Sequence, residues 1–264
     1  MQKIKNLLKS RATRNAGWLI GGSIVNKLLA FIVGIWMARY LGPNNYGLIN
    51  YAAAYTTFFF SLCSLGINNI IVKEFIDDSK REGETLGTTL LLQSSSSILS
   101  IIMILLITFV MDAGESVTIT VVFLCSLGLF FQELDTIKYW FQAKLESKYA
   151  AIASTIAYIV SSVYKIFLLI TGKSVQWFAL STSIDYLCVA IVLFIAYKRN
   201  KGPKLQFSFE KAKKLIKNSY HYILSGLMVS IYGATDKLML KQMLNESIVG
   251  YYSTCLLYTS VRGC

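Results

Sequence analysis

Charged residues and prolines are scarce in this sequence. Only 15% of its 264 residues are Asp, Glu, Lys or Arg, 55% are apolar, and two are proline. Soluble domains usually carry about one quarter charged residues. Apolar runs as long as those described below would also leave a soluble protein almost no amphipathic helix to face water. The composition therefore excludes an ordinary soluble fold and favours a membrane protein.

Residue patterns that support enzyme chemistry are lacking as well. The chain has one histidine, His221, and its five cysteines include no pair at metal-ligand spacing. We find no phosphate-binding loop and no Ser-His-Asp set, and the connections between apolar runs are too short for a catalytic domain. We therefore expect no enzymatic activity, no metal and no cofactor, and we interpret His221 as structural.

Seven long apolar runs account for most of the chain. They cover residues 16–41, 47–72, 86–111, 116–134, 150–171, 175–197 and 219–244. Each run has about 19 to 26 residues, enough to cross roughly 30 Å of hydrocarbon as a helix. The sequence predicts an all-α fold, a polytopic transmembrane helical bundle.

Positive charges gather in every second connection. The basic segments are the N-terminal tail and residues 73–81, 138–148 and 198–217. Lys and Arg concentrate in cytoplasmic loops. We therefore predict a multi-pass protein of the cytoplasmic membrane, with its N-terminus in the cytoplasm. The net charge of +12 is spread over these connections, where it can contact anionic lipid, so we expect no nucleic-acid partner.

A short polar turn occurs twice. ARYLGPNNYG (38–47) and KQMLNESIVG (241–250) align when Gly47 is placed on Gly250. Six runs separate the turns, so both would lie on the extracytoplasmic side, as in transporters with two similar lobes. Gly42 and Pro43 are predicted to stop the first helix, and with Gly47 they form the candidate hinge. The alternative is that any two helical hairpins look alike.

The repeat suggests a division of the chain. We expect a cytoplasmic tail at 1–15, an N-terminal transmembrane lobe with its linker at 16–217, and the start of a second lobe at 218–254. The last segment, 255–264, begins with CLLYTS, which resembles a translated sequencing adaptor. We interpret it as a non-native tail on an N-terminal fragment; the alternative is a genuine short tail.

Several charged residues lie inside the apolar runs, where a charge is costly unless it faces protein or water. The cations are Lys27, Arg39, Lys165 and Lys237, and the acids are Asp185 and Asp236. Several cations in one cavity would suit a pyrophosphate, so the four cations are the candidate substrate-binding residues. The two acids are the candidate sites for a coupling ion, Na⁺ or H⁺. The alternative is structural pairing, for example of Lys27 with Asp185.

The segment MARYLGPNNYGLINYAAAYTTFFFSLCSLGINNIIVKEF (37–75) resembles the N-terminal signature of bacterial polysaccharide flippases. These are the O-antigen and teichuronic-acid type exporters of the multidrug/oligosaccharidyl-lipid/polysaccharide superfamily. SGLMVSIYGATDKLML (225–240) is similar to the start of their second lobe. The resemblance implies export of undecaprenyl-pyrophosphate-linked oligosaccharide by alternating access, with Lys27 projecting into a central cationic cavity. On this resemblance we expect most of the second lobe to be missing from the sequence.

The resemblance also implies partners: the lipid-linked oligosaccharide, membrane lipids, and a polysaccharide polymerase or ligase. Three alternatives remain open. A drug or cation exporter of the same superfamily would favour acidic cavity residues. A membrane polymerase or ligase would need a large extracytoplasmic loop. A half-length protein would act as a scaffold in a polysaccharide synthesis complex.

Overall fold

The computed structural model describes residues 11–262, and within this range the protein is all-α, as predicted. Its helices are α2 (Arg11–Cys63), α3 (Ile71–Asp77), α4 (Glu82–Met111), α5 (Ser116–Glu133), α6 (Ile137–Ala143), α7 (Lys148–Thr171), α8 (Val175–Arg199), α9 (Phe209–Met243) and α10 (Glu246–Arg262). Two 3₁₀ turns, η1 (Ile67–Asn69) and η2 (Leu134–Thr136), join α2 to α3 and α5 to α6.

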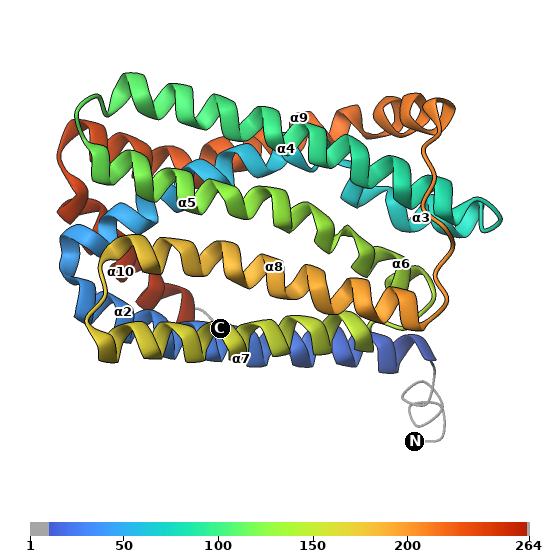
Figure 1. The fold of residues 1–264 in the computed structure, drawn as a ribbon, viewed down its shortest axis with the longest axis horizontal. Helices are drawn as coiled ribbons and strands as arrows, with labels where there is room; N and C mark the ends of the chain where they lie inside the picture. Colours follow the sequence, from blue (N-terminus) through green and yellow to red (C-terminus); the bar gives the residue numbers. More distant parts are fainter. Residues whose placement is uncertain (1–10, 263–264) are drawn as a thin grey trace.

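The long helices lie side by side, and their connections alternate between the two ends of the bundle (Figure 1). One end, here called the Gly42 end, holds the kink in α2 and the α4–α5, α7–α8 and α9–α10 connections. The opposite end, here called the N-terminal end, holds α3, α6 and residues 200–208. The basic segments 73–81, 138–148 and 198–217 all lie at this end or next to it. Residues 1–10 of the basic tail lie outside the described residues.

Six helices of the described chain are long and apolar enough to span a membrane. The first of these, Ile20–Cys63, has 44 residues, roughly 66 Å at the α-helical rise and about twice the hydrocarbon thickness. Gly42 divides it, with φ 70° and ψ 173°, a region that essentially only glycine occupies. The two parts run in opposite directions (Figure 1), so α2 contains the first predicted run and most of the second.

The two predicted turns have the same register. After Gly42 the helix resumes at Pro43, so the break is shorter than the predicted turn at 42–46. Proline is tolerated there, because the first residues of a helix have no partner for the backbone N–H that proline lacks. The amide of Asn45 donates to the Leu41 carbonyl at 3.3 Å and satisfies the end of the first segment. In the second copy Asn245 caps α10 by accepting from the Ile248 N–H at 3.1 Å. Gly42 and Asn245 occupy the same position in the aligned turns, and each therefore stands at an equivalent helix start.

The second predicted run is too long. It was expected to reach residue 72, but α2 ends at Cys63. Leu65 and Gly66 then adopt positive φ values of 49° and 63° and turn the chain into η1. The turn lies against α9: a Cβ on Gly66 would sit 2.8 Å from the Ile223 backbone nitrogen. The helix therefore ends where the chain packs closely against α9, a helix distant in sequence. The apolar residues of the run alone do not predict this end.

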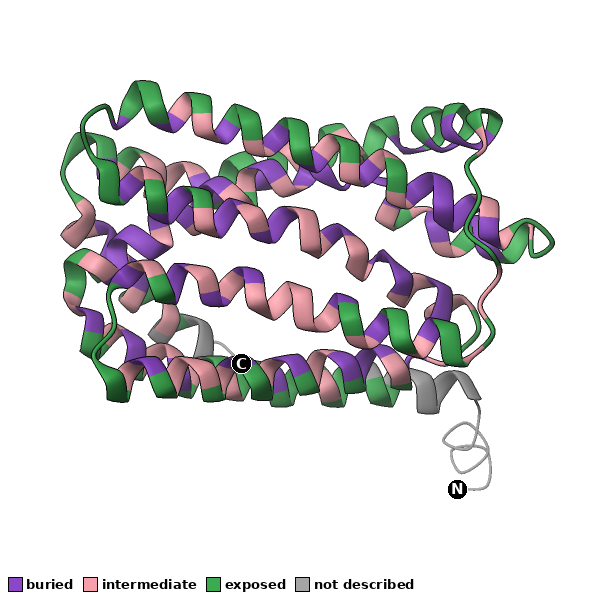
Figure 2. Ribbon diagram, viewed as in Figure 1, coloured by how far each residue is buried: buried purple, intermediate pink, exposed green. Residues whose placement is uncertain are grey.

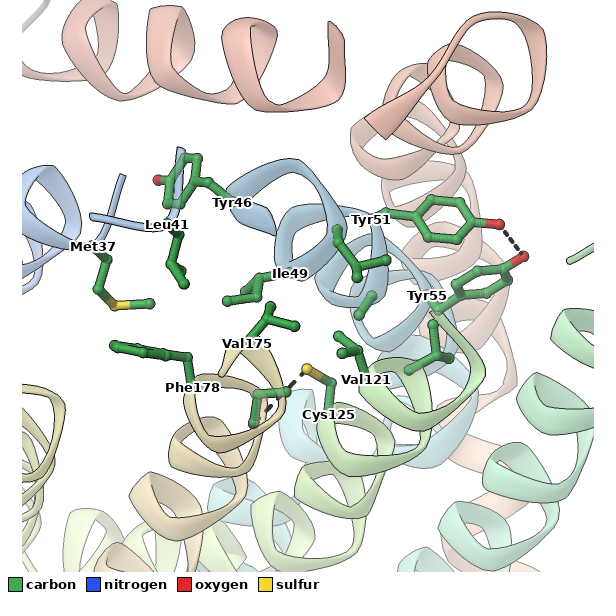
Figure 3. Packing of buried hydrophobic residues seen from close by; sticks show 14 of the residues in the cluster. Met37, Leu41, Tyr46, Ile49, Tyr51, Tyr55, Val121, Cys125, Val175 and Phe178 are labelled. Atoms are coloured by element: carbon green, nitrogen blue, oxygen red, sulfur yellow. Dashed lines mark hydrogen bonds between the residues drawn. The ribbon is translucent and has the colours of Figure 1, made fainter. Parts of the chain in front are cut away.

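Buried and exposed residues alternate along the long helices (Figure 2). Many of the exposed residues are large and apolar. One buried cluster lies toward the Gly42 end and includes Leu41, Val121, Val175 and Phe178 from α2, α5 and α8 (Figure 3). A second includes Trp140, Phe141 and Leu193 toward the N-terminal end. Exposed apolar side chains such as Ile170, 80% exposed, suit contact with lipid tails.

We predict that Gly66→Ala lowers the thermal unfolding midpoint of the purified protein in detergent. A side chain there meets the backbone of α9 and has an unfavourable φ, which together cost about 1–2 kcal/mol or more. Gly233→Ala on α9 is the matched control, because a Cβ there meets nothing within 4 Å. Equal midpoints for the two variants would contradict the packing of this turn.

Candidate functional site

The two repeated turns contact each other reciprocally. A Cβ on Gly47 would lie 1.8 Å from the Glu246 carbonyl oxygen, and a Cβ on Gly250 would lie 2.1 Å from the Pro43 carbonyl oxygen. Gly250 occupies the position of Gly47 when the two turns are aligned. In the same alignment Glu246 occupies the position of Pro43. Each turn therefore places its glycine against the equivalent residue of the other, as in a contact across a two-fold axis.

A buried ammonium group lies beside this contact. Lys241 of α9, 7% exposed, contacts Asp112 at 2.5 Å and Glu115 at 2.7 Å in the α4–α5 connection. Its Nζ also lies 3.6 Å from Glu246 at the start of α10. We call Lys241 and these three carboxylates the Lys241 cluster. It joins α9 and α10 to the α4–α5 connection at the Gly42 end.

Asp112 is the most enclosed member of the Lys241 cluster. Its side chain is 0% exposed, and its carboxylate also accepts from the Tyr51 hydroxyl at 2.9 Å and the Gln242 amide at 3.1 Å. These bonds replace the water that a buried carboxylate loses. Glu115 is nearly half exposed, and its hydrogen bond from Lys241 lowers the pKa of the carboxyl. The contact of Glu115 with Lys241 is therefore complete at neutral pH and weakens only as the pH falls through that lowered pKa.

Further contacts hold α9 against α2 and α3 toward the N-terminal end. Lys211 contacts Asp78 at 2.6 Å, and Lys214 contacts Glu74 at 2.9 Å. Near the middle of α9 the hydroxyls of Ser61 and Ser230 are 2.5 Å apart. The helix is thus bound to the first part of the chain along most of its length.

Two of the predicted site residues pair with each other. The Lys165 ammonium on α7 lies 3.1 Å from Asp185 on α8, so Asp185 has a different partner from the suggested Lys27. The other carboxylate oxygen of Asp185 is buried without a hydrogen-bond partner. Asp185 also lines a cavity of about 130 Å³ with Tyr158, Thr182 and Tyr186. The pair therefore has room beside it for a water molecule or a small cation.

Lys27 is exposed and makes no ion pair within the described residues. It precedes Gly34 and Ala38 by two and three helical turns, so the three share one face of the α2 helix. That face meets α10: Gly34 approaches Leu257, and Ala38 lines a cavity of about 290 Å³ with Gly250. Lys27 therefore lies on the side of α2 that α10 covers, further toward the N-terminal end.

The other predicted residues are dispersed. Arg39 is exposed and lines the same 290 Å³ cavity near Pro43. Lys237 and Asp236 lie on α9, where the Asp236 carboxylate accepts from the Lys237 backbone N–H at 2.7 Å. The structure thus joins Lys165 to Asp185 but does not gather the four candidate cations in one place.

The Lys241 cluster was not predicted, although the sequence carried a signal. Asp112 and Glu115 form an acidic pair in a connection otherwise poor in charge. Lys241 begins the second repeated turn and is far from them along the chain. An acidic pair and a lysine at the same membrane depth indicate such a contact, but the packing of α9 against α4 is needed to bring them together.

Together the apolar helices, alternating connections and buried interhelical ion pairs define a multi-pass helical membrane protein. The chain matches the family of polysaccharide biosynthesis proteins over residues 12–260, nearly its whole length, and it belongs to this family, of the flippase type. The resemblance identified in the sequence is thereby confirmed. No curated protein and no solved structure matches the chain.

We predict that Lys241→Met destabilises the protein by about 3–5 kcal/mol, because it leaves the Asp112 carboxylate buried without its counter-ion. Adding Asp112→Asn should recover part of this loss. The free energy of unfolding in detergent micelles measures both changes.

Lys237→Met, on the same helix, is the matched control and should have little effect, because Lys237 makes no ion pair within the described residues. Similar losses in Lys241→Met and Lys237→Met would show that the Lys241 cluster does not stabilise the fold.

Proposed function

We propose that the protein exports a lipid-linked oligosaccharide across the cytoplasmic membrane for surface polysaccharide synthesis. The observation that carries this proposal is the family match over residues 12–260. The low charge of the six apolar helices fits a protein that works within the bilayer. In this proposal the pyrophosphate-linked sugar passes between two similar lobes while its lipid tail stays in the membrane.

The basic segments support one orientation. They lie at the N-terminal end of the bundle, and Lys and Arg concentrate on the cytoplasmic side. The proposed arrangement places the N-terminus and the segments around α3, α6 and 200–208 in the cytoplasm. The Gly42 end then faces outward.

In this orientation the structure corresponds to a form that is closed on the outer side. At the Gly42 end the Gly47–Gly250 contact joins α10 to α2, and the Lys241 cluster joins α9 and α10 to the α4–α5 connection. Opening toward the outside would separate Lys241 from Asp112 and expose both to water, which solvates the freed charges. Alternating access requires such a contact to form and break in each cycle.

Lys27 is the cation best placed for the pyrophosphate. It is unpaired within the described residues, it lies on the face of α2 toward α10, and a free ammonium is attracted to phosphate strongly in a low-dielectric site. Lys165 is held by Asp185. A coupling ion that neutralises Asp185 would release Lys165 for the substrate, which links the proposed ion site and the proposed phosphate site. Arg39 and Lys237 would act nearer the Gly42 end.

We predict that Lys27→Ala abolishes surface polysaccharide while the amount of protein in the membrane stays normal. Lys27→Arg should retain part of the export, because the positive charge remains. Lys173→Ala is the matched control, since Lys173 is an exposed cation of the α7–α8 connection. Normal polysaccharide in Lys27→Ala would remove Lys27 from the substrate site.

A second prediction concerns the contact between the turns. Gly47→Ala and Gly250→Ala should both reduce export strongly, because each added Cβ collides with a backbone carbonyl of the other turn. Gly34→Ala is the control on α2, where the nearest atom is a side-chain carbon at 3.7 Å. Surface polysaccharide, corrected for protein level, is the measurement. Normal export by both turn variants would mean that the contact plays no part in transport.

A further inference from the structure

Glu133 is a buried carboxyl that the proposed transport site does not use. It is the last residue of α5 and is 1% exposed. Both of its carboxylate oxygens are buried and have no hydrogen-bond partner. The buried Asp112 and Glu74 and the half-buried Asp185 differ, because each contacts a lysine ammonium.

The polar groups around Glu133 are already satisfied. Thr136, one turn further along, donates to the Gln93 side-chain oxygen at 2.7 Å. The Gln93 amide donates to the Ser64 carbonyl and the Asn68 side chain at 3.1 and 3.0 Å. This network fills the space between the end of α2, α4 and η2, and Glu133 is not part of it.

The charged and titratable neighbours of Glu133 do not supply a counter-ion in contact with it. Lys138 is hydrogen-bonded to Asp135. The remaining titratable groups near Glu133 and Asp135 are one thiol and two phenols, which carry no positive charge: Cys63 on α2, Tyr139 on α6 and Tyr186 on α8. On α4 the network contributes Gln93, which does not titrate.

A carboxylate in this position would be an uncompensated buried charge, which costs several kcal/mol or more. A carboxyl that lacks a cation and donors is therefore more stable with a proton. Asp135, two residues further toward the N-terminal end, is 23% exposed at its side chain. It is the nearest acidic group through which a proton can exchange with water at that end.

We infer that Glu133 is a proton-binding site, and that it holds one proton when the side chain is buried as in this structure. No covalent step is involved: the carboxylate gains a proton from water at the N-terminal end and becomes a neutral acid. Within the proposed function, gain and loss of this proton would couple transport to the proton gradient. The proton site itself does not depend on the proposed function.

The test uses dicyclohexylcarbodiimide, which reacts with protonated carboxyls in apolar surroundings. The full chain in detergent is treated at several pH values, and the modified residue is identified by mass spectrometry. Modification of Glu133 should be strong at acidic pH and should decline as the pH rises. Glu133→Gln should remove it, and Glu74, which pairs with Lys214, should react much less.

A second measurement does not depend on access of the reagent. Infrared spectra should show the C=O stretch of a protonated acid at neutral pH, and this band should be missing in Glu133→Gln. Absence of a band that depends on Glu133 would overturn the inference. Protection of Glu133 from the carbodiimide by Na⁺ at constant pH would also overturn it, in favour of a sodium site.

Polysaccharide export separates this inference from the proposed function. Glu133→Gln mimics the permanently protonated form and should reduce export at least tenfold with normal protein levels. Glu133→Asp, which can still release a proton, should retain more export. If Glu133 binds a proton but the unmodified protein exports no polysaccharide, the proton site stands and the proposed function fails.

Discussion

The close contact between two helix turns organises this structure. Glycines at 47 and 250 allow the backbones of α2 and α10 to meet, and any side chain at either position would collide with a carbonyl. This close contact between the two backbones fixes where α10 lies on α2. It also fixes the direction of α9 and which residues meet in the Lys241 cluster. Because the contact joins residues that are equivalent in the sequence repeat, it also supports a two-fold relation between the repeated parts.

Buried charges add a second constraint, and most of them are paired between helices. Lys241 pairs with Asp112, and Lys165 pairs with Asp185. In a low-dielectric bundle, removing one partner costs more than the pair itself contributes, because the remaining charge is left uncompensated. Such pairs suit a transporter, since they are stable in a closed form and separate readily only where water or a substrate charge replaces the lost partner. Glu133 is buried without a paired cation, and a bound proton would neutralise its charge.

Much of the fold could be predicted from the sequence. Runs at 86–111, 116–134, 150–171 and 175–197 agree with α4, α5, α7 and α8 within a few residues, because hydrocarbon thickness fixes how long an apolar helix must be. The break at Gly42 was predicted from Gly followed by Pro. The early end of α2 was not, since it depends on the approach of Gly66 to α9.

The candidate site was harder to predict. Single charges in apolar runs identified Lys165 and Asp185, but not that they pair, because their contact depends on how α7 rotates against α8. Glu133 closes an apolar run and looks like a residue at the membrane surface, whereas it is buried at the junction of α5 and η2. The predicted division at residue 217 stays a prediction, and α9 continues through it without a break. The predicted adaptor tail at 255–264 also stays a prediction, although α10 reaches Arg262 and the family match ends at 260.

The proposed transport cycle requires α9 and α10 to move against the first part of the chain, which includes α2. Ser61 and Ser230 offer the most direct test, because their hydroxyls are 2.5 Å apart and cysteines there are within reach of a disulfide. In a cysteine-free background, the Ser61→Cys/Ser230→Cys variant should form the disulfide on oxidation and stop exporting polysaccharide, and reductant should restore export. Each single-cysteine variant is the control. A disulfide-linked protein that exports at the normal rate would contradict alternating access between these two helices.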